Sequence, residues 1–340
     1  MNENSMQDSA TLHTLRETAQ RLLADAKGLL AMDESNPTAD KRFAALGIPQ
    51  TVEMRRAYRD LIVNTPRLGE SIGGAILFDE TIRQQAHDGT PFAQALVRAG
   101  IIPGIKVDAG AKPLALHDGE LVTEGLDGLR ERLAEYAGMG ARFAKWRAVI
   151  TIGAGLPSHA CLGANAHALA RYAALCQEAG IVPIVEPEVL MDGDHSLERC
   201  AEVTAHTLAV VFAQLHAQGV ALEGMLLKPN MVVPGLKCAQ QASADDVADA
   251  TVEVFRRAVP AAVAGIAFLS GGQSADDATA RLSAMHRRWR DRLPWPLSFS
   301  FARAIQDPAM KAWAGRADNV LAAQQALESR ARANREARLA

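Results

Sequence analysis

Lys228 ends an apolar run of strand length, Gly224-Met-Leu-Leu-Lys228, and a proline follows it. A lone lysine in this position usually extends into solvent, because lysine is seldom fully buried without a partner. The arrangement is repeated, however: other apolar runs end at Asp33-Glu34, Lys106-Val-Asp108, Lys145-Trp-Arg147 and Glu186-Pro-Glu188. Three of these runs space their charges i, i+2, which places both side chains on one face of a strand. The repetition favours one shared polar site.

The charges in these runs balance. The basic residues Lys106, Lys145, Arg147 and Lys228 are matched by the acidic residues Asp33, Asp108, Glu186 and Glu188. Helices cover the outer faces of a parallel sheet, so such pairs can only face a shared interior. Because an unpaired buried charge costs several kcal/mol, the balance indicates a pre-assembled polar site.

The chemistry that this set allows starts from a lysine amine. A lysine becomes a nucleophile when its pKa falls from about 10.4 to roughly 7 or 8, which costs about 3 to 5 kcal/mol. Burial and a neighbouring cation such as Lys145 both act in that direction. The amine then adds to a ketone or aldehyde to form a Schiff base, and a carboxyl group of Glu186, Glu188 or Asp33 would move the protons.

A second motif has the composition of an anion site. Ser270-Gly271-Gly272 follows a predicted strand, and Ser274 is placed to cap the helix after it. Its backbone N–H groups would hold an anion, although such a sequence is more often an ordinary turn. Arg303 follows the next strand, at the place where barrels commonly bind phosphate. The two features together favour a phosphate site.

No metal or cofactor is predicted. The nine histidines are scattered along the chain, and Asp192-Gly-Asp194-His195 is better explained as a turn leading to a helix cap at Ser196. The sequence Gly153-Ala-Gly155 lacks the third glycine of a dinucleotide-binding loop, because Ser158 stands there.

The polar runs lie on a regular series of elements. Eight strands are predicted, at 28–32, 73–78, 100–106, 141–147, 181–188, 222–228, 264–269 and 297–303. Asp33 and Ser300 lie 267 residues apart over seven intervals, about 38 residues per unit, which suits a βα repeat. The prediction is an α/β protein with a (β/α)8 TIM barrel, favoured over an open doubly wound sheet because its polar strand ends would converge.

One domain is predicted over residues 1–340, with the barrel at about 28–304. An N-terminal helix at 11–27 precedes it, and a C-terminal helical segment at 305–340 follows it. Further helices are predicted around 121–136, 165–178 and 196–218 from the spacing of apolar residues. The basic residues Arg330, Arg332, Arg335 and Arg338 are interpreted as a solvated helix face.

Composition excludes several classes. With 49% hydrophobic residues and a formal net charge of −3, the chain has neither the composition of a disordered protein nor a field for nucleic acid. It contains no run of 18 apolar residues and its N-terminus lacks a signal-peptide core, so no membrane partner and a cytoplasmic location are expected. The four widely spaced cysteines are expected to be reduced.

The ordered motifs resemble those of class I, Schiff-base-forming fructose-bisphosphate aldolases, over about residues 22–325. The matching segments are Ala31-Met-Asp33-Glu-Ser35, Gly104-Ile-Lys106-Val-Asp108, Phe143-Ala-Lys145-Trp-Arg147, Ile184-Val-Glu186-Pro-Glu188, Leu227-Lys228-Pro-Asn230, Phe268-Leu-Ser270-Gly-Gly-Gln-Ser274 and 300–303. The resemblance implies the same barrel, a homotetramer, and reversible cleavage of fructose 1,6-bisphosphate to dihydroxyacetone phosphate and glyceraldehyde 3-phosphate.

The resemblance also implies roles for individual residues. Lys228 would form the Schiff base, Glu186 would be the principal acid and base, and Asp33 would hydrogen-bond the C4 hydroxyl. Glu188 and Lys145 would tune the nucleophile and hold substrate, and Lys106 would reach substrate oxygens. The C1 phosphate would bind at Ser270, Gly271, Ser300 and Arg303, and the C6 phosphate at Ser35, Thr38, Lys41 and Arg42.

The chain departs from the family pattern in three places. Phe301-Ala302 stands where many relatives have Tyr-Gly, and Ser35-Asn-Pro37-Thr38 replaces Ser-Thr-Gly-Ser. The family's C-terminal tyrosine has no counterpart, the last tyrosine being Tyr172, so another group is expected to protonate the enamine. These differences leave open a Schiff-base aldolase for a related keto-sugar phosphate, and a catalytically inactive barrel that serves as a binding protein.

Overall fold

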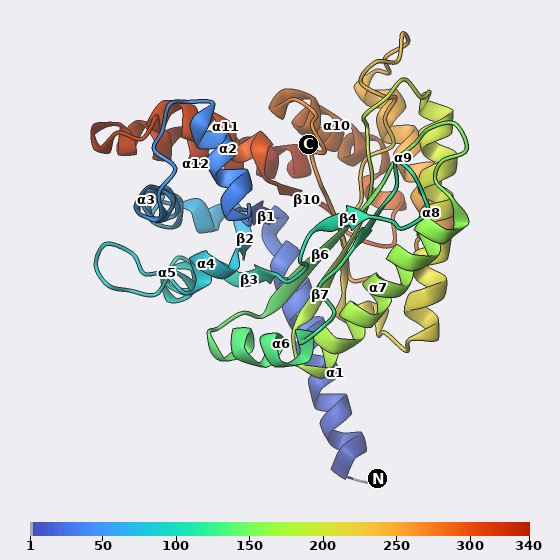
Figure 1. The fold of residues 1–340 in the computed structure, drawn as a ribbon, viewed down its shortest axis with the longest axis horizontal. Helices are drawn as coiled ribbons and strands as arrows, with labels where there is room; N and C mark the ends of the chain where they lie inside the picture. The colour runs from blue at the N-terminus through green and yellow to red at the C-terminus, as the bar shows by residue number, and fades with distance from the viewer. Residues whose placement is uncertain (1–2) are drawn as a thin grey trace.

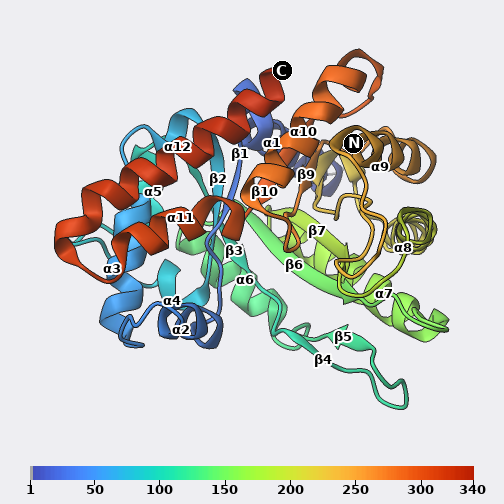
Figure 2. The ribbon, with the colours of Figure 1, turned by 90° about the horizontal axis from the view of Figure 1, so that it is seen from above.

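A computed structural model describes the backbone of residues 3–340 and the side chains of residues 9–340. Eight parallel strands close into a barrel in the order β1-β10-β9-β8-β7-β6-β3-β2 (Figures 1 and 2). The closing contact pairs Leu29 of β1 with Ser300 of β10, so the first and last barrel strands lie side by side. The predicted (β/α)8 barrel is therefore confirmed.

The barrel strands differ in length. The longest pair, β6 and β7, is in register from Phe143 with Val182 to Ile150 with Val189. The strands are β1 (Gly28–Ala31), β2 (Ile72–Leu77), β3 (Ile102–Lys106), β6 (Phe143–Ile150), β7 (Val182–Val189), β8 (Leu226–Leu227), β9 (Ile266–Phe268) and β10 (Leu297–Phe301).

Helices surround the barrel in the connections between strands, as Figure 1 shows. They are α1 (Glu3–Leu23), α2 (Asn36–Ala44), α3 (Val52–Val63), α4 (Asp79–Ile82), α5 (Phe92–Arg98), α6 (Leu129–Gly138), α7 (His159–Glu178), α8 (Leu197–Ala217), α9 (Ala244–Ala258), α10 (Ala275–Trp289), α11 (Arg303–Trp313) and α12 (Val320–Leu339). The helix predicted at 165–178 begins earlier, because the Ser158 hydroxyl accepts a hydrogen bond from the Cys161 N–H and caps α7.

The N-terminal end of the barrel is closed by α1. Its Leu15, Ala19, Leu22 and Leu23 pack with inward-facing apolar residues of the strands. Among these is Phe143, whose ring fills the space beside two glycines: a Cβ on Gly74 or Gly104 would lie 2.9 or 2.3 Å from it. The lower barrel interior is thus a packed apolar core, and a cavity within the barrel must lie at the other end.

The strand alternation places the charges above this core. Phe143 and Ile184 belong to the inner apolar cluster, and Lys145 and Glu186 follow them by two residues. Because side chains alternate with a period of two, Lys145 and Glu186 point into the same interior one layer closer to the C-terminal ends. The spacing that singled out these residues is the spacing that turns them inward.

The region after β3 corrects one prediction. The expected helix at 121–136 begins only at Leu129, and Leu121–Thr123 forms strand β5, antiparallel to β4 (Ala111–Pro113). This hairpin extends outward from the barrel in Figure 2. Thr123 anchors the hairpin to distant partners, because its N–H donates to Asn165 Oδ1 and its hydroxyl donates to the Arg147 carbonyl. Such distant partners leave no periodic signal in the sequence.

The C-terminal helix α12 corrects a second prediction. Arg332 is exposed, but Arg338 is only 8% exposed and donates to the carbonyls of Leu23 and Lys27, just before β1. Arg330 pairs with Asp276 at 2.8 Å. The interpretation of these arginines as a fully solvated face was therefore wrong: α12 packs on α10 and α11 and ends near the closed end of the barrel.

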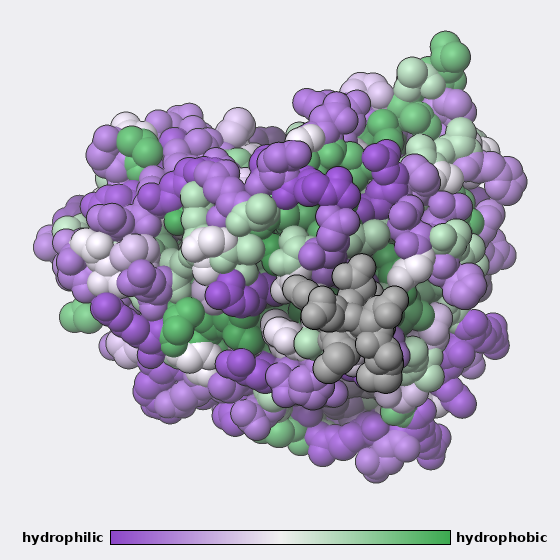
Figure 3. Space-filling model, turned by 90° about the horizontal axis from the view of Figure 1, so that it is seen from below, coloured by the Kyte–Doolittle hydropathy of each residue, from purple (hydrophilic) through white to green (hydrophobic). Residues whose placement is uncertain are grey.

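The surface of the closed end is shown in Figure 3, where hydrophilic residues dominate and hydrophobic ones form separate patches. Among the described residues, none of the helices combines the length and the apolar character needed to span a bilayer.

Candidate active site

A cavity of about 550 Å³ opens at the C-terminal ends of the barrel strands. Most residues predicted to act in chemistry or binding line it: Asp33, Thr38, Lys41, Arg42, Lys145, Arg147, Glu186, Glu188, Lys228, Ser270, Gly271, Ser300 and Arg303. The lining residues that sequence reasoning had not assigned are Ala31, Glu34, Ala45, Leu269 and Ala302. The strand ends therefore converge on one site.

Three predicted residues do not line the cavity. Lys106 turns to Asp108 instead, with Nζ 2.6 Å from Oδ1 and 2.7 Å from the carbonyl oxygen of that residue. The Ser35 hydroxyl bonds to that of Thr38 at 3.0 Å. Gly272 is next to the lining residue Arg303: a Cβ on Gly272 would lie 3.7 Å from Arg303 Nη2. Gly272 and Ser35 are thus adjacent to lining residues, whereas Lys106 is held by its own strand end.

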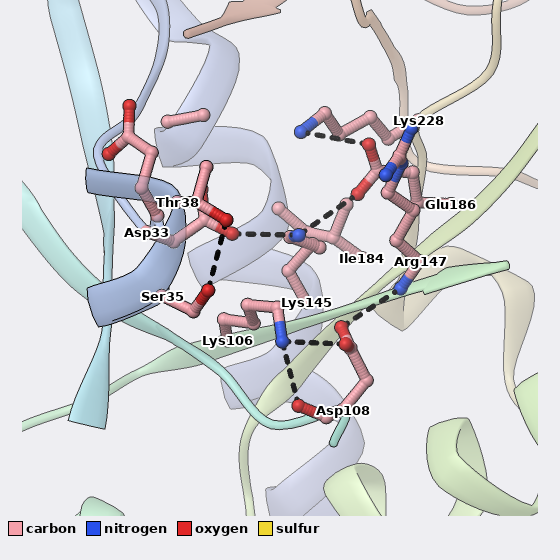
Figure 4. Close-up of polar contacts among 12 residues, drawn as sticks. Asp33, Ser35, Thr38, Lys106, Asp108, Lys145, Arg147, Ile184, Glu186 and Lys228 are labelled. Carbon is pink, nitrogen blue, oxygen red and sulfur yellow. Dashed lines mark hydrogen bonds and ion pairs between the residues drawn. The ribbon is translucent and has the colours of Figure 1, made fainter. Parts of the chain in front are cut away.

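The centre of the site is a chain of ion pairs (Figure 4). Lys145 Nζ lies 2.7 Å from Asp33 Oδ2 and 3.4 Å from Glu186 Oε2. Lys228 Nζ lies 3.2 Å from the other oxygen of Glu186, Oε1. All four side chains are at least 89% buried. Glu186 therefore connects the two lysines.

The electrostatics follow from this geometry. Burial opposes the ionisation of Asp33, but the charges of Lys145 and Lys228 outweigh it and lower the pKa of Asp33 to about 2. Burial also opposes the charge on Lys145, yet the carboxylates of Asp33 and Glu186 raise the pKa of Lys145 well above its usual value. At neutral pH, Asp33 is a carboxylate and Lys145 a fixed cation beside Glu186.

A second ion pair, between Arg147 and Glu188, lies nearer the mouth of the cavity. Arg147 Nε contacts Glu188 Oε2, and the Arg147 side chain is 43% exposed while that of Glu188 is 6% exposed. The backbone N–H of Arg147 donates to Asp108 Oδ2 at 3.3 Å. Asp108 thus accepts from β6 and holds Lys106 at the same time, and Arg147 presents its guanidinium at the mouth of the cavity.

One end of the cavity is built on β9 and β10. Gly271 and Gly272 adopt φ of 58° and 100°, conformations that glycine accepts without strain. Two such residues in succession turn the backbone after Ser270 toward the cavity. The buried Ser300 hydroxyl makes no hydrogen bond within the described residues and faces the same space. These groups, with the exposed Arg303, can hold an anion.

The other end is built on α2. Thr38, Lys41 and Arg42 line the cavity from this helix. Arg42 is paired on both sides, through Nη1 to Glu34 and through Nη2 to Asp307 Oδ1 at 2.7 Å. Glu34 also accepts a hydrogen bond from Arg59 at 2.9 Å. Burial acts to raise the pKa of Glu34, but the charges of Arg59 and Arg42 outweigh it and lower that pKa. The adjacency of Glu34 to Asp33 in the strand-end run was the signal that could have found it.

No set of three or more histidine, cysteine, aspartate or glutamate side chains in the described part of the chain is arranged to hold a metal ion. The loop at Asp192–His195 instead leads to Ser196, whose side chain accepts from the Arg199 N–H and caps α8. The charged side chains that line the cavity are lysines, arginines and carboxylates.

Comparisons with known proteins agree with this geometry. The family model "Fructose-bisphosphate aldolase class-I" matches residues 14–340. A probable fructose-bisphosphate aldolase class 1 of Xanthomonas campestris is 57% identical, over 95% of this chain and 97% of its own length. The cytosolic fructose-bisphosphate aldolase 6 of Arabidopsis thaliana is 49% identical, over 94% of this chain and 91% of its own.

A solved structure gives the same result. The fructose-bisphosphate aldolase from Plasmodium falciparum, crystallised with TRAP and a small-molecule inhibitor, superimposes with a TM-score of 0.95 at 46% identity, covering 97% of this chain and 95% of that one. A parallel (β/α)8 barrel with a lysine and carboxylate site at its strand ends defines a barrel enzyme. The chain belongs to the class I fructose-bisphosphate aldolase family, which confirms the resemblance seen in the sequence. It is a lyase of the metal-independent class.

Proposed function

We propose that this enzyme reversibly cleaves fructose 1,6-bisphosphate to dihydroxyacetone phosphate and glyceraldehyde 3-phosphate, as in glycolysis, through a Schiff base on Lys228. The observation that carries the proposal is the position of Glu186 between Lys228 and Lys145, with Asp33 on the far side of Lys145. A nucleophilic amine, a proton carrier and a fixed cation thereby share one buried site.

The first step needs a neutral amine. Transfer of a proton from Lys228 to Glu186, 3.2 Å away, would leave an uncharged amine beside a protonated carboxyl group. The fixed charge of Lys145 disfavours a second cation at Lys228 and so promotes loss of the Lys228 proton, while it also stabilises Glu186 as a carboxylate. Lys228 Nζ then attacks the C2 carbonyl carbon, and Glu186 returns its proton to the hydroxyl group that leaves as water.

The iminium is the electron sink for cleavage. As the C4 hydroxyl loses its proton, the C3–C4 bond breaks, its electron pair moves toward the iminium nitrogen, and the aldehyde departs. The low pKa of Asp33 makes it a weak base, so we assign the proton to Glu186 and give Asp33 the role of accepting the C4 hydroxyl's hydrogen bond. Apart from its ion pair with Lys145, Glu186 Oε2 has no hydrogen-bond partner within the described residues, so it has lone pairs for this role.

The enamine left on Lys228 is then protonated at C3 and hydrolysed to the ketone. Glu186, which carries the C4 proton at this stage, is the group that we propose for the transfer. Tyr172 is excluded, because it is buried and donates to the Ala144 carbonyl at 2.7 Å. Nor does α12 cover the mouth, since it ends near the closed end of the barrel.

The two phosphates would bind at opposite ends of the cavity. The loop at Ser270 and Gly271, with Ser300 and Arg303, suits the C1 phosphate, and Thr38, Lys41 and Arg42 suit the C6 phosphate. Arg147 and Glu188 would contact the sugar between them. Ser35, Gly272 and Lys106 are proposed to act from just outside the cavity wall.

By likeness to relatives, we further propose a cytoplasmic homotetramer. The Arabidopsis thaliana relative is named cytosolic, which supports the location. Sedimentation equilibrium on the purified chain tests the assembly, and a mass of one or two chains would contradict it.

The decisive test of the mechanism is reductive trapping. Borohydride added together with dihydroxyacetone phosphate should inactivate the enzyme and add the reduced three-carbon adduct to Lys228, because hydride converts an iminium to a stable amine. Peptide mass spectrometry locates the adduct. Borohydride alone is the control. An adduct on another lysine, or none, would overturn the assignment of Lys228.

A further inference from the structure

Helix α2 presents two opposite faces, each with its own function. At about 100° per residue, Thr38, Lys41, Arg42 and Ala45 fall within about 100° of arc, and they line the cavity. Asn36 and Asp40 lie four residues apart on one side of the helix, roughly 170° from the centre of that arc. The face that meets the cavity is therefore opposite the face that carries Asn36 and Asp40.

Both residues of that outer face are held by a shared ion network. The Asn36 amide donates to Glu80 Oε2 at 2.8 Å. Asp40 Oδ1 accepts from Arg55 Nη1 at 2.8 Å. Arg55 in turn grips Glu80 with two parallel bonds of 2.8 Å, from Nε to Oε1 and from Nη2 to Oε2. We call these four residues the α2 clamp.

The clamp has the form of a rigid support. The side chains of Arg55, Glu80 and Asp40 are 13%, 20% and 25% exposed, so they are more shielded than an ordinary surface pair. Paired guanidinium and carboxylate groups with two parallel bonds fix an orientation as well as a distance. Arg55 comes from α3 and Glu80 from α4, so α2 is tied to two elements outside the cavity.

A short helix needs such support. α2 spans nine residues, and the side chain of its N-cap residue, Ser35, makes no capping hydrogen bond. Isolated helices shorter than about 12 residues are marginal in water, so the position of α2 is set by its tertiary contacts. Lys41 and Arg42 belong to this helix, and any shift of α2 moves both cations together.

We infer that Arg55 and Glu80 are positioning residues, which hold α2 so that Lys41 and Arg42 meet the phosphate farther from the bond to the lysine, and that the clamp thereby sets the preference for bisphosphorylated over monophosphorylated ketoses. The inference rests on the proposed function. Among the described residues, the side-chain hydrogen bonds and ion pairs of the four clamp residues join them only to one another, and the Lys228 end of the site lies on other strands. Loss of the clamp therefore acts on one phosphate only.

The test compares two substrates on one variant. In Arg55→Gln, kcat/KM for fructose 1,6-bisphosphate should fall by about 10- to 100-fold, mostly through KM, because displaced cations no longer meet the phosphate. For fructose 1-phosphate, which has no group at that end, kcat and KM should stay within about twofold. Arg55→Lys keeps the charge but not the paired bonds, and should restore only part of the ratio.

A matched control separates positioning from general stability. Arg130 of α6 also makes a two-bond pair, with Glu178 of α7 at 2.7 and 3.2 Å, but its side chain is 62% exposed. Arg130→Gln should leave the ratio of the two kcat/KM values unchanged. Asp40→Asn, which alters one clamp contact at constant size, should shift the ratio in the same direction as Arg55→Gln by a smaller factor, and it serves if Arg55→Gln fails to fold.

An unchanged ratio of the two kcat/KM values in Arg55→Gln and Asp40→Asn would overturn the inference, whether neither substrate is affected or both are affected equally. Trapping with borohydride and dihydroxyacetone phosphate keeps this result apart from the proposed function. If Lys228 is labelled in both the parent and Arg55→Gln while the ratio stays the same, the clamp proposal fails alone. If the parent is not labelled, the proposed function fails first.

Discussion

The two ends of the cavity are built in different ways. At the β9 and β10 end, backbone and short side chains at strand ends, Ser270, Gly271 and Ser300, face the cavity together with Arg303. At the α2 end the charged groups that face the cavity, Lys41 and Arg42, lie on a nine-residue helix. Barrel closure fixes the first end through backbone hydrogen bonds, whereas side-chain ion pairs fix the second. The two proposed phosphate sites thus differ in what holds them in place, strand pairing at one end and ion pairs at the other, and substitutions should distinguish them.

The largest expected effect comes from the centre, which serves both ends alike. Glu186→Gln keeps the shape but cannot carry a proton, so kcat should fall by about 10²- to 10⁴-fold with little change in KM. Steady-state kinetics with fructose 1,6-bisphosphate and fructose 1-phosphate measure it, and the loss should be equal for the two. A rise in KM at unchanged kcat would assign Glu186 to binding instead.

The next effect isolates the helical end. If Lys41 binds the C6 phosphate as proposed, Lys41→Ala removes one charge-assisted contact and should lower kcat/KM for fructose 1,6-bisphosphate by about 10- to 100-fold. Fructose 1-phosphate should be processed at the parent rate. The exposed Lys112 of β4 lies outside the cavity, and Lys112→Ala is the matched control. If Lys41→Ala affects both substrates to the same extent, the two ends of the cavity are not independent.

A smaller effect isolates the strand end. Gly272 has φ of 100°, and an alanine there is strained by about 1 to 3 kcal/mol, so the backbone of the loop at Ser270 and Gly271 should shift. KM should rise by roughly 5- to 10-fold for both substrates, since both carry the C1 phosphate. Gly180, with φ of 68° and open space around it, ends α7 away from the cavity. Gly180→Ala should lower Tm without raising KM. If KM rises similarly in Gly180→Ala, the rise in Gly272→Ala does not report on the strand end of the cavity.

The smallest effect concerns the stability of the charged centre. The pKa of Asp33 is about 2 in the folded protein and 3.8 in a free side chain, so its stabilising contribution is full above pH 4 and lost as pH falls toward 2. Asp33→Asn should lower the free energy of unfolding by on the order of 1 to 2 kcal/mol at pH 6, and by less at pH 3. Urea midpoints at both pH values measure the difference.

The exposed Asp118 of the hairpin provides the control for that measurement. Asp118→Asn should show no such change between pH 6 and pH 3. If Asp33→Asn costs the same at both pH values, then packing rather than ionisation explains the role of Asp33 in stability.

Several features were predictable from the sequence because they depend on local periodicity. The i, i+2 spacing of Lys145 with Arg147 and of Glu186 with Glu188 follows directly from the strand repeat, and apolar residues two positions earlier set the direction inward. Helix caps at Ser243 and Ser274 are equally local, each accepting a bond from the N–H three residues later. Site residues that continue a strand were therefore found before any coordinates.

Features that depend on distant partners were not predictable. Lys106 shares the spacing of the others, yet its own Asp108 holds it away from the cavity. Arg338 has the pattern of a surface residue but becomes buried because α12 ends against the carbonyls before β1. The hairpin of β4 and β5 forms through contacts with Asn165 and Arg147 that lie 42 and 24 residues away.

The sequence by itself determined the repeat of strands, the balance of charges at their ends and, with these, the barrel and the lysine and carboxylate chemistry. Only the tertiary structure decided which acid meets which base: that Glu186 bridges Lys145 and Lys228, that Glu34 lies under Arg42, and that α2 is held by Arg55 and Glu80. The physical reason is that strand periodicity fixes the direction of a side chain, whereas pairing depends on distances across the barrel, which only its closure sets.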